Sequence, residues 1–187
     1  MSKIFAVGIA GGSASGKSTL CGKLEKELQE YKISVFHTDS YYKSGRAPIK
    51  AFVTGREYLD DNHPDAVDLR RLESDMLAVI NKNEHDILIA EGLFTLWDDG
   101  ICNNLDLKIF VDCKPDERIV RRLKRNMQWN LSFDEIADVY LDMVRYRHEE
   151  YVEPSKWRAD IIINGSNPTD PSLEILVGYI KNKVNNK

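Results

Sequence analysis

The sequence has few cysteines, no long apolar run and no recognisable targeting signal. Its three cysteines, Cys21, Cys102 and Cys113, lie far apart and form no C-x-x-C pair, which argues against a disulfide framework or a zinc site and favours a reducing compartment. No apolar segment approaches the roughly 18 residues of a membrane-spanning helix, and the chain begins with a strand-like segment where a targeting signal would stand. We therefore expect a cytoplasmic protein that does not bind a membrane.

An excess of positive charge is also absent. The chain has 26 lysines and arginines against 30 aspartates and glutamates, a formal net charge of −4. Proteins that bind the phosphate backbone of nucleic acids usually carry a basic excess, so we expect no nucleic acid partner. Apolar residues make up 42% of the 187 positions, enough for a well-packed core, and this length fits one domain over residues 1–187.

A glycine-rich motif marks the first candidate site. Gly11, Gly16, Lys17 and Ser18 match the phosphate-loop spacing G-x-x-x-x-G-K-[ST], between a strand-like run and a helical leucine pattern. Backbone N–H groups in such a loop bind phosphate, the lysine reaches the outer phosphates, and the hydroxyl of Ser18 would be a ligand of Mg²⁺. The expected nucleotide-binding residues are Gly11, Gly12, Ser13, Ala14, Ser15, Gly16, Lys17, Ser18 and Thr19.

Strand-like runs alternate with helical patterns along the whole chain. This alternation predicts a doubly wound α/β fold, in which a parallel five-stranded sheet has helices on both faces. Ligands of such folds bind beyond the carboxyl ends of the strands. The segment 43–64 is rich in glycine, proline and charge, and we interpret it as a long irregular connection. The strand-like runs are residues 4–9, 33–37, 86–90, 107–112 and 160–163.

Two acidic residues follow predicted strands at the edge that carries the phosphate loop. Asp39 comes just after the second strand, where its carboxylate could accept a proton from a substrate hydroxyl or reach the metal, although Asp before Ser is also a common turn sequence. Glu91 ends the third strand, a position that holds Mg²⁺ in phosphate-loop enzymes. The competing interpretation of Glu91 is an exposed acid at a strand end.

An arginine stripe follows the fourth strand. Arg118, Arg121, Arg122 and Arg125 fall at i, i+3, i+4 and i+7 and therefore share one face of a helix. Such a stripe is usually a solvated face, and we interpret Arg118 in this way. The later arginines are candidates to clamp the transferred phosphoryl group.

A second helix follows after a short break. Ser132 and Glu135 have the spacing of a capping box, which predicts a helix from Ser132 to about Tyr151. Two helices joined in this way after an arginine-rich stretch are typical of a movable lid that excludes water from a kinase site. The lid would cover approximately residues 122–134.

Three further segments complete the prediction. Asp65 and Asp68 are placed in the first turn of a helix whose apolar stripe starts at Leu69, where acidic residues favour the helix dipole. The turn at residues 164–168 would lie near an adenine, and a last helix would run from Ser172 to about Lys183.

In their order along the chain, several of these segments resemble uridine kinases of the phosphoribulokinase/uridine kinase family. The resemblance spans nearly the whole chain and is more specific than the phosphate loop alone. The segments are Gly11 to Thr19, residues 38–43, the N-H-P-D-A-V-D stretch at 62–68, Glu91-Gly92, residues 111–112 with 118–125, and residues 148–156 with 159–163.

This resemblance implies the P-loop NTP hydrolase fold with a helical lid, and ATP-dependent, magnesium-assisted phosphorylation of a hydroxyl, in the family the 5′-hydroxyl of a ribonucleoside. Asp39 matches the catalytic acid of the family and Asp65 matches the carboxylate that holds the ribose hydroxyls. The implied site consists of catalytic Asp39, Lys17, Arg122 and Arg125, substrate-binding Asp39, Tyr42 and Asp65, and the magnesium ligands Ser18 and Glu91.

Two departures from the family leave the acceptor open. The hairpin that carries aromatic and histidine residues before the E-G strand is missing between Asn83 and Asp86, and the lid R-G-R is replaced by Q-W-N-L-S at 128–132. A nicotinamide riboside kinase or another sugar or alcohol kinase is therefore an alternative.

Two alternatives belong to other functional classes. One is a GTP-dependent switch, because residues 81–84 are similar to its N-K-x-D motif, but they end in Glu and precede the third strand. The other is a catalytically silent nucleotide-binding protein. Feedback regulation and a homo-oligomeric state stay open.

Overall fold

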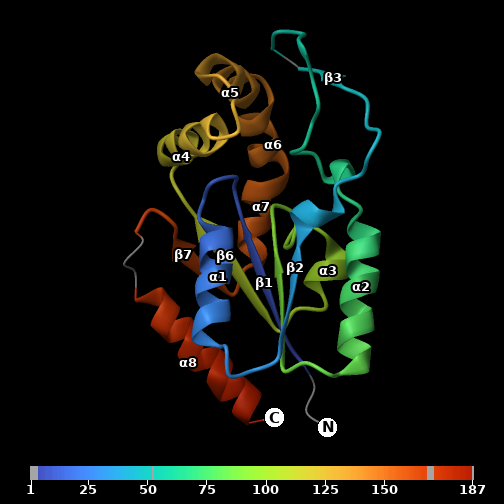
Figure 1. Cartoon of the computed structure of the whole chain (residues 1–187), viewed down its shortest axis with the longest axis vertical. Helices are drawn as coiled ribbons and strands as arrows, with labels where there is room; N and C mark the ends of the chain where they lie inside the picture. The colour runs from blue at the N-terminus through green and yellow to red at the C-terminus, as the bar shows by residue number, and fades with distance from the viewer. Residues whose placement is uncertain (1–3, 52, 168–170, 187) are drawn as a thin grey trace.

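The computed structural model describes residues 4–51, 53–167 and 171–186, and it has a parallel sheet at its centre (Figure 1). The strand order is β2-β5-β1-β6-β7, and each neighbouring pair is parallel, which confirms the predicted doubly wound α/β fold. The strands are β1 (Phe5–Gly11), β2 (Ile33–His37), β5 (Ile87–Glu91), β6 (Leu107–Asp112) and β7 (Ile161–Asn164).

Helices cover both faces of this sheet. The α-helices are α1 (Lys17–Glu27), α2 (Leu69–Lys82), α3 (Asp99–Cys102), α4 (Pro115–Met127), α5 (Phe133–Val139), α6 (Arg145–Arg147), α7 (Glu153–Ser155) and α8 (Ser172–Asn185). Short 3-10 turns are η1 (Thr38–Tyr41), η2 (Pro64–Ala66) and η5 (Lys156–Arg158), and π-helical turns are η3 (Tyr140–Val144) and η4 (His148–Val152). The elements from α5 to η5 follow one another without a break and form one helical segment from Phe133 to Arg158.

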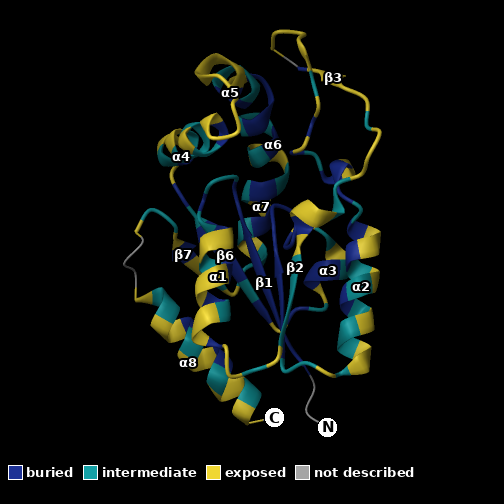
Figure 2. Ribbon diagram, in the orientation of Figure 1, coloured by how far each residue is buried: buried dark blue, intermediate teal, exposed yellow. Residues whose placement is uncertain are grey.

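The core consists of two apolar layers, one on each face of the sheet. Every residue of β1 is buried, and its side chains alternate: Val7 and Ile9 pack toward α1 and α8, whereas Ala6 and Ala10 pack toward α2 and α3. Figure 2 shows the buried strands between helices whose outer surfaces are exposed. Burial on both faces explains why the strands are near-continuous apolar runs, which made them visible in the sequence.

The carboxyl ends of the parallel strands meet at one edge of the sheet. The phosphate loop, η1 and the end of β5 lie at this edge, and the α4–α5 pair stands above it in Figure 1. Ser132 caps α5, and its side chain and that of Glu135 form the predicted capping box. The start of β1 and the end of α8 lie at the opposite end of the molecule.

Two local predictions were wrong. The segment 43–64 is not wholly irregular, because Ile49–Lys50 (β3) pairs with Glu57–Tyr58 (β4) in an antiparallel hairpin. Asp65 does not lie in the first turn of α2. That helix starts at Leu69 with Asp68 as its N-cap, whose carboxylate accepts from the backbone N–H of Arg71 at 3.1 Å.

Two observations concern the limits of the described chain. Within residues 4–51, 53–167 and 171–186, no helix has both the length and the apolar character needed to cross a membrane. The predicted adenine-side turn is described as far as Asn167, and Pro168 lies outside the described residues.

Candidate active site

The phosphate loop joins β1 to α1 in a conformation suited to anion binding. Gly16 has a φ of 105° and Ala14 a φ of 63°, so both residues adopt the left-handed conformation. Such turns direct successive backbone N–H groups into one concavity at the positive end of α1. Lys17 is only 7% exposed. Its burial lowers the pKa of its ammonium, and the carboxylates of Glu91 and Asp39 oppose that shift.

Glu91 and Ser18 lie together beside the loop. The hydroxyl of Ser18 is 3.2 Å from Oε2 and 3.3 Å from Oε1 of Glu91, whose side chain is buried. Nδ1 of His37, at the end of β2, is 2.8 Å from Oε1 of the same carboxylate. A hydroxyl and a carboxylate are hard oxygen donors of the kind that Mg²⁺ accepts, together with phosphate oxygens and water, so these residues fit that ion. The described residues contain no group of three or more His, Cys, Asp or Glu that could hold a metal by themselves.

A close contact between the Thr38 side chain and Gly92 holds Asp39 near the end of β5. Asp39 belongs to η1, which directly follows β2, and Thr38 before it is buried against Gly92. A Cβ atom on Gly92 would lie 1.7 Å from Oγ1 of Thr38, so only glycine allows η1 to pack against the end of β5. Asp39 itself is exposed at the edge of the sheet.

Arg122 and Arg125 converge on the phosphate loop from α4. Nη1 of Arg122 donates to Oγ of Ser13 at 2.9 Å, and Nη2 of Arg125 donates to the same oxygen at 3.3 Å. Burial and the neighbouring charge of Arg125 lower the pKa of Arg122, and its buried Nε has no hydrogen-bond partner among the described residues. Two close guanidinium groups with a spare donor are suited to bind phosphate oxygens.

The other two arginines of the stripe have structural contacts. Arg118 was expected on a solvated face, but it is 4% exposed and donates from Nε to the carbonyl of Cys113 at 3.0 Å. This interpretation was therefore wrong. Arg121 donates to the carbonyl of Gly165 at 2.8 Å and thereby joins α4 to the turn after β7.

Two cavities meet at the edge of the sheet. The first, of about 670 Å³, contains the phosphate loop and extends to Gly165 and Asn167. The second, of about 930 Å³, extends between the β3–β4 hairpin and α5. The residues that line both cavities are Lys17, Asp39, Arg125 and Trp129.

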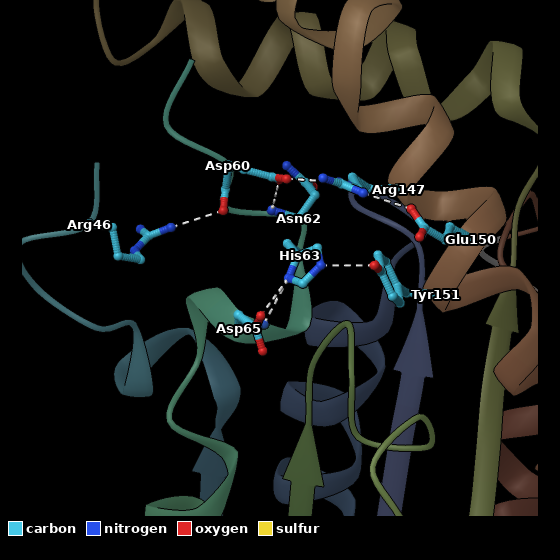
Figure 3. Close-up of polar contacts among 8 residues, drawn as sticks. All are labelled: Arg46, Asp60, Asn62, His63, Asp65, Arg147, Glu150 and Tyr151. Atoms are coloured by element: carbon cyan, nitrogen blue, oxygen red, sulfur yellow. Dashed lines mark hydrogen bonds and ion pairs between the residues drawn. The ribbon is translucent and has the colours of Figure 1, made fainter. Parts of the chain in front are cut away.

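Of the two residues predicted to bind the acceptor beside Asp39, Tyr42 lies on the second cavity and Asp65 does not. Tyr42 lines the second cavity, and its hydroxyl donates to the carbonyl of Asp61 at 2.9 Å. Asp65 is not among the residues that line this cavity: its side chain is 91% exposed, and Oδ2 lies 3.6 Å from Nδ1 of His63 (Figure 3). Nε2 of His63 also forms a hydrogen bond with the hydroxyl of Tyr151, at 2.8 Å.

A buried ion pair anchors the segment that precedes η2. Nε of Arg147, on α6, lies 2.8 Å from Oδ2 of Asp60, and the two side chains are 8% and 6% exposed (Figure 3). Oδ1 of Asp60 accepts from the backbone N–H of Asn62 at 3.0 Å, and Arg46 donates to the Asp60 carbonyl at 2.9 Å. This anchor holds Asp61 and Asn62 on the wall of the second cavity.

Comparison with known proteins identifies the relatives of this chain. The sequence pattern described as "Phosphoribulokinase / Uridine kinase family" matches residues 73–170. The uridine kinase of Clostridium novyi is 32% identical over 206 residues, which cover 97% of this chain and 97% of that enzyme. The uridine kinase of Clostridium botulinum (strain Okra) is 34% identical and covers 97% and 98%. The chain belongs to the phosphoribulokinase/uridine kinase family.

Solved structures agree in fold with this family assignment. Phosphoribulokinase from Rhodobacter spheroides has a TM-score of 0.64 at 14% identity, covering 89% of this chain and 74% of that one. A possible uridine kinase from Bacillus stearothermophilus has a TM-score of 0.51 at 20% identity, covering 88% and 90%. The expected P-loop kinase fold is confirmed, and as a member of this family the chain is an ATP-dependent phosphotransferase that acts on a hydroxyl group.

Within this family framework, several site residues escaped the sequence analysis. His37 contacts Glu91, and Tyr58 and Asp61 line the second cavity. The signal for His37 was available, because it is the last residue of a strand at the ligand-binding edge. Tyr58 and Asp61 lie in the segment interpreted as irregular, whose geometry had no periodic signal.

Proposed function

We propose that this chain transfers the γ-phosphoryl group of ATP to the 5′-hydroxyl of a ribonucleoside. The observation that carries the proposal is the junction of the two cavities. Lys17, Asp39 and Arg125 line both the cavity that contains the phosphate loop and the one that extends toward the hairpin. A phosphoryl group placed at this junction would face an acceptor in the second cavity.

On the donor side, the phosphate loop receives the ATP phosphates and the adenine extends toward Gly165 and Asn167. Ser18 and Glu91 would hold Mg²⁺, which, when bound, supplies positive charge to neutralise the phosphate oxygens. Lys17, Arg122 and Arg125 stabilise the charge on the transferred group.

On the acceptor side, Asp39 orients the hydroxyl and accepts its proton. The hydroxyl oxygen forms a bond to the γ-phosphorus, the bond from that phosphorus to the bridging oxygen breaks, and ADP leaves with the electron pair. Asp39 is exposed, so its carboxylate is free to meet a substrate. Most of the rate enhancement comes from positioning and electrostatics.

The second cavity is suited to a nucleoside in size and in chemistry. Its volume of about 930 Å³ exceeds what a small polyol would fill. Leu59, Leu131 and Trp129, all on its lining, are 48%, 41% and 63% exposed. A flat ring would cover these apolar surfaces, while Asp61 and Asn62 are placed to contact ribose hydroxyls. Asp65, which the family resemblance assigns to these hydroxyls, would have to turn into the cavity to contribute.

A nucleoside with a cationic ring, such as nicotinamide riboside, is a second candidate acceptor. Helix α2 ends at Lys82 and β5 begins at Ile87, which leaves no room for a ring-reading hairpin between them. The cavity lining instead includes the carboxylates of Glu57, Asp61 and Asp138. Asp61 also pairs with Arg46 and Asp138 with Arg56, so a ring with positive charge or N–H donors, which these carboxylates favour, would compete with the two arginines.

Two further assignments belong to this proposal. Residues 122–134 act as a lid that excludes water, so that the phosphoryl group passes to the acceptor. The reaction belongs in the cytosol, and the three free, buried cysteines are in keeping with a reducing compartment.

ADP release, measured over a panel of acceptors, tests the proposal. The panel contains uridine, cytidine, nicotinamide riboside, pantothenate and sugar phosphates, with Asp39→Ala as the blank. We expect at least one nucleoside to stimulate ADP release far above the blank, and pantothenate and sugar phosphates to give little stimulation. If no nucleoside does so, the proposal is wrong. A preference for GTP over ATP would favour the switch instead.

A further inference from the structure

The β3–β4 hairpin lies where the acceptor must bind. In Figure 1 it stands across from α4 and α5, beyond the carboxyl ends of the strands. The second cavity extends between these elements, and its lining takes Tyr58 and Leu59 from the hairpin side and Ile136 and Val139 from α5. Asp39 lies on the same lining, so a substrate that presents its hydroxyl to Asp39 extends toward the hairpin.

A buried carboxylate fixes the hairpin to the helical side of the cavity. Oδ2 of Asp142 accepts from Oγ1 of Thr54 at 2.5 Å and from the hydroxyl of Tyr58 at 3.0 Å, and Asp142 is only 5% exposed. Arg56 on the hairpin pairs with Asp138. Burying an unpaired carboxylate at this place would be costly. The hydroxyl donors of Thr54 and Tyr58 on the hairpin compensate for the burial of Asp142.

The backbone around Asp142 departs from a regular α-helix. Asp142 belongs to η3, a π-helical turn of five residues between α5 and α6. Single π-turns inside helices are rare and occur often at functional sites. Here the turn presents Asp142 to the hairpin. The hairpin is therefore held in a defined position beside the cavity.

We infer that the β3–β4 hairpin selects the acceptor, with Tyr58 contacting the planar ring of the nucleoside and Asp142 positioning Tyr58. This inference rests on the proposed nucleoside kinase function and adds the element that recognises the ring. Tyr58 and Leu59 line the cavity from the hairpin side, and Ile136 and Val139 line it from α5; the space between them is the slot that we assign to the ring. A ring inserted between them loses its apolar surface to the protein.

The test compares two acceptors that share the ribose and differ in the ring. One is the nucleoside that gives the highest kcat/KM in the panel, and the other is methyl β-D-ribofuranoside, which has the 5-hydroxyl and the ribose but no planar base. For Tyr58→Ala we expect the KM of the nucleoside to rise by at least about tenfold. The kcat/KM of the methyl riboside should change by no more than about twofold, because this acceptor never reached the slot.

Two control variants complete the design. Tyr58→Phe keeps the ring and removes only the hydroxyl bonded to Asp142, so its KM should lie between those of the wild type and Tyr58→Ala. Tyr179→Ala removes a tyrosine that is 41% exposed on α8, and should leave both acceptors unaffected. The melting temperature of each variant, measured in parallel, shows that the protein is folded.

Three outcomes would overturn the inference. A nucleoside KM within twofold of the wild-type value in Tyr58→Ala would show that Tyr58 does not contact the ring. An equal loss of kcat/KM with both acceptors would show that Tyr58 supports only the fold. If the wild type phosphorylates neither acceptor, the proposed function fails first, and this result is distinct from a failure of the hairpin assignment alone.

Discussion

Nη1 of Arg122 lies 2.9 Å from the hydroxyl of Ser13, so helix α4 contacts the phosphate loop directly. Arg125 donates to the same hydroxyl, which places two guanidinium groups at one point of the loop. The like charges of the two guanidinium groups repel each other, and an anion bound between them would relieve the repulsion. The arrangement in the free protein is therefore prepared for phosphate.

Arg122→Ala should lower kcat on the order of a hundredfold, because a charged donor to the transferred group is lost. The KM of ATP should change less, since the loop and Lys17 still hold the phosphates. The matched control is Lys124→Ala, which removes an exposed basic side chain from the same helix. Steady-state kinetics on both variants gives the comparison, and a kcat above half of the wild-type value in Arg122→Ala would contradict the assigned role.

Glu91→Gln should raise the Mg²⁺ concentration required for half-maximal activity by at least about tenfold, because the neutral amide is a poorer ligand, or partner of a ligand, for the ion. Calorimetric titration of Mg²⁺ into the protein with a non-hydrolysable ATP analogue provides a readout independent of turnover. Glu84→Gln, an exposed acid before β5, is the control. Identical Mg²⁺ titrations for Glu91→Gln and wild type would remove Glu91 from the magnesium site.

His148 makes the stability of the fold depend on pH. Burial and the nearby charge of Arg118 lower the pKa of His148 to about 4, while Nε2 lies 3.2 Å from Glu153. The unfolded chain binds a proton on this residue near pH 6.5 and the folded chain only near pH 4, so stability is full above pH 6.5 and falls as the pH drops toward 4. Between pH 7 and pH 5 the loss from this group is about 2 kcal/mol.

Urea unfolding at pH 7 and pH 5 measures this effect. His148→Asn cannot titrate, and the stability difference between the two pH values should shrink by about 2 kcal/mol in this variant. An unchanged difference would show that His148 is not the responsible group.

The strands and the phosphate loop could be predicted because their signals are local. The strands of a sheet buried on both faces are continuous apolar runs, and the loop is read from four specified residues. The capping box at Ser132 is likewise complete within four residues. In each case the signal lies within a few neighbouring residues.

The residues that were missed or misplaced depend on distant contacts. The arginine stripe defines one face of α4, but nothing in its spacing shows that Arg118 packs behind the phosphate loop. The strands of the β3–β4 hairpin are two residues each, too short for an alternating pattern, and hydrogen bonds from Thr54 and Tyr58 to Asp142, more than 80 residues away, tie the hairpin to the helical segment. Asp65 lies within the 3-10 turn η2, ahead of α2, and its side chain is exposed there.

The central claim concerns Asp39, and single-turnover phosphoryl transfer in Asp39→Asn tests it most directly. ATP binding, measured separately by calorimetry, should stay within about threefold of the wild-type value, because the phosphate loop is untouched. The rate of transfer to the best nucleoside should fall at least about a hundredfold, the lower range for the loss of a general base. A transfer rate close to that of the wild type, with ATP still bound, would contradict the account.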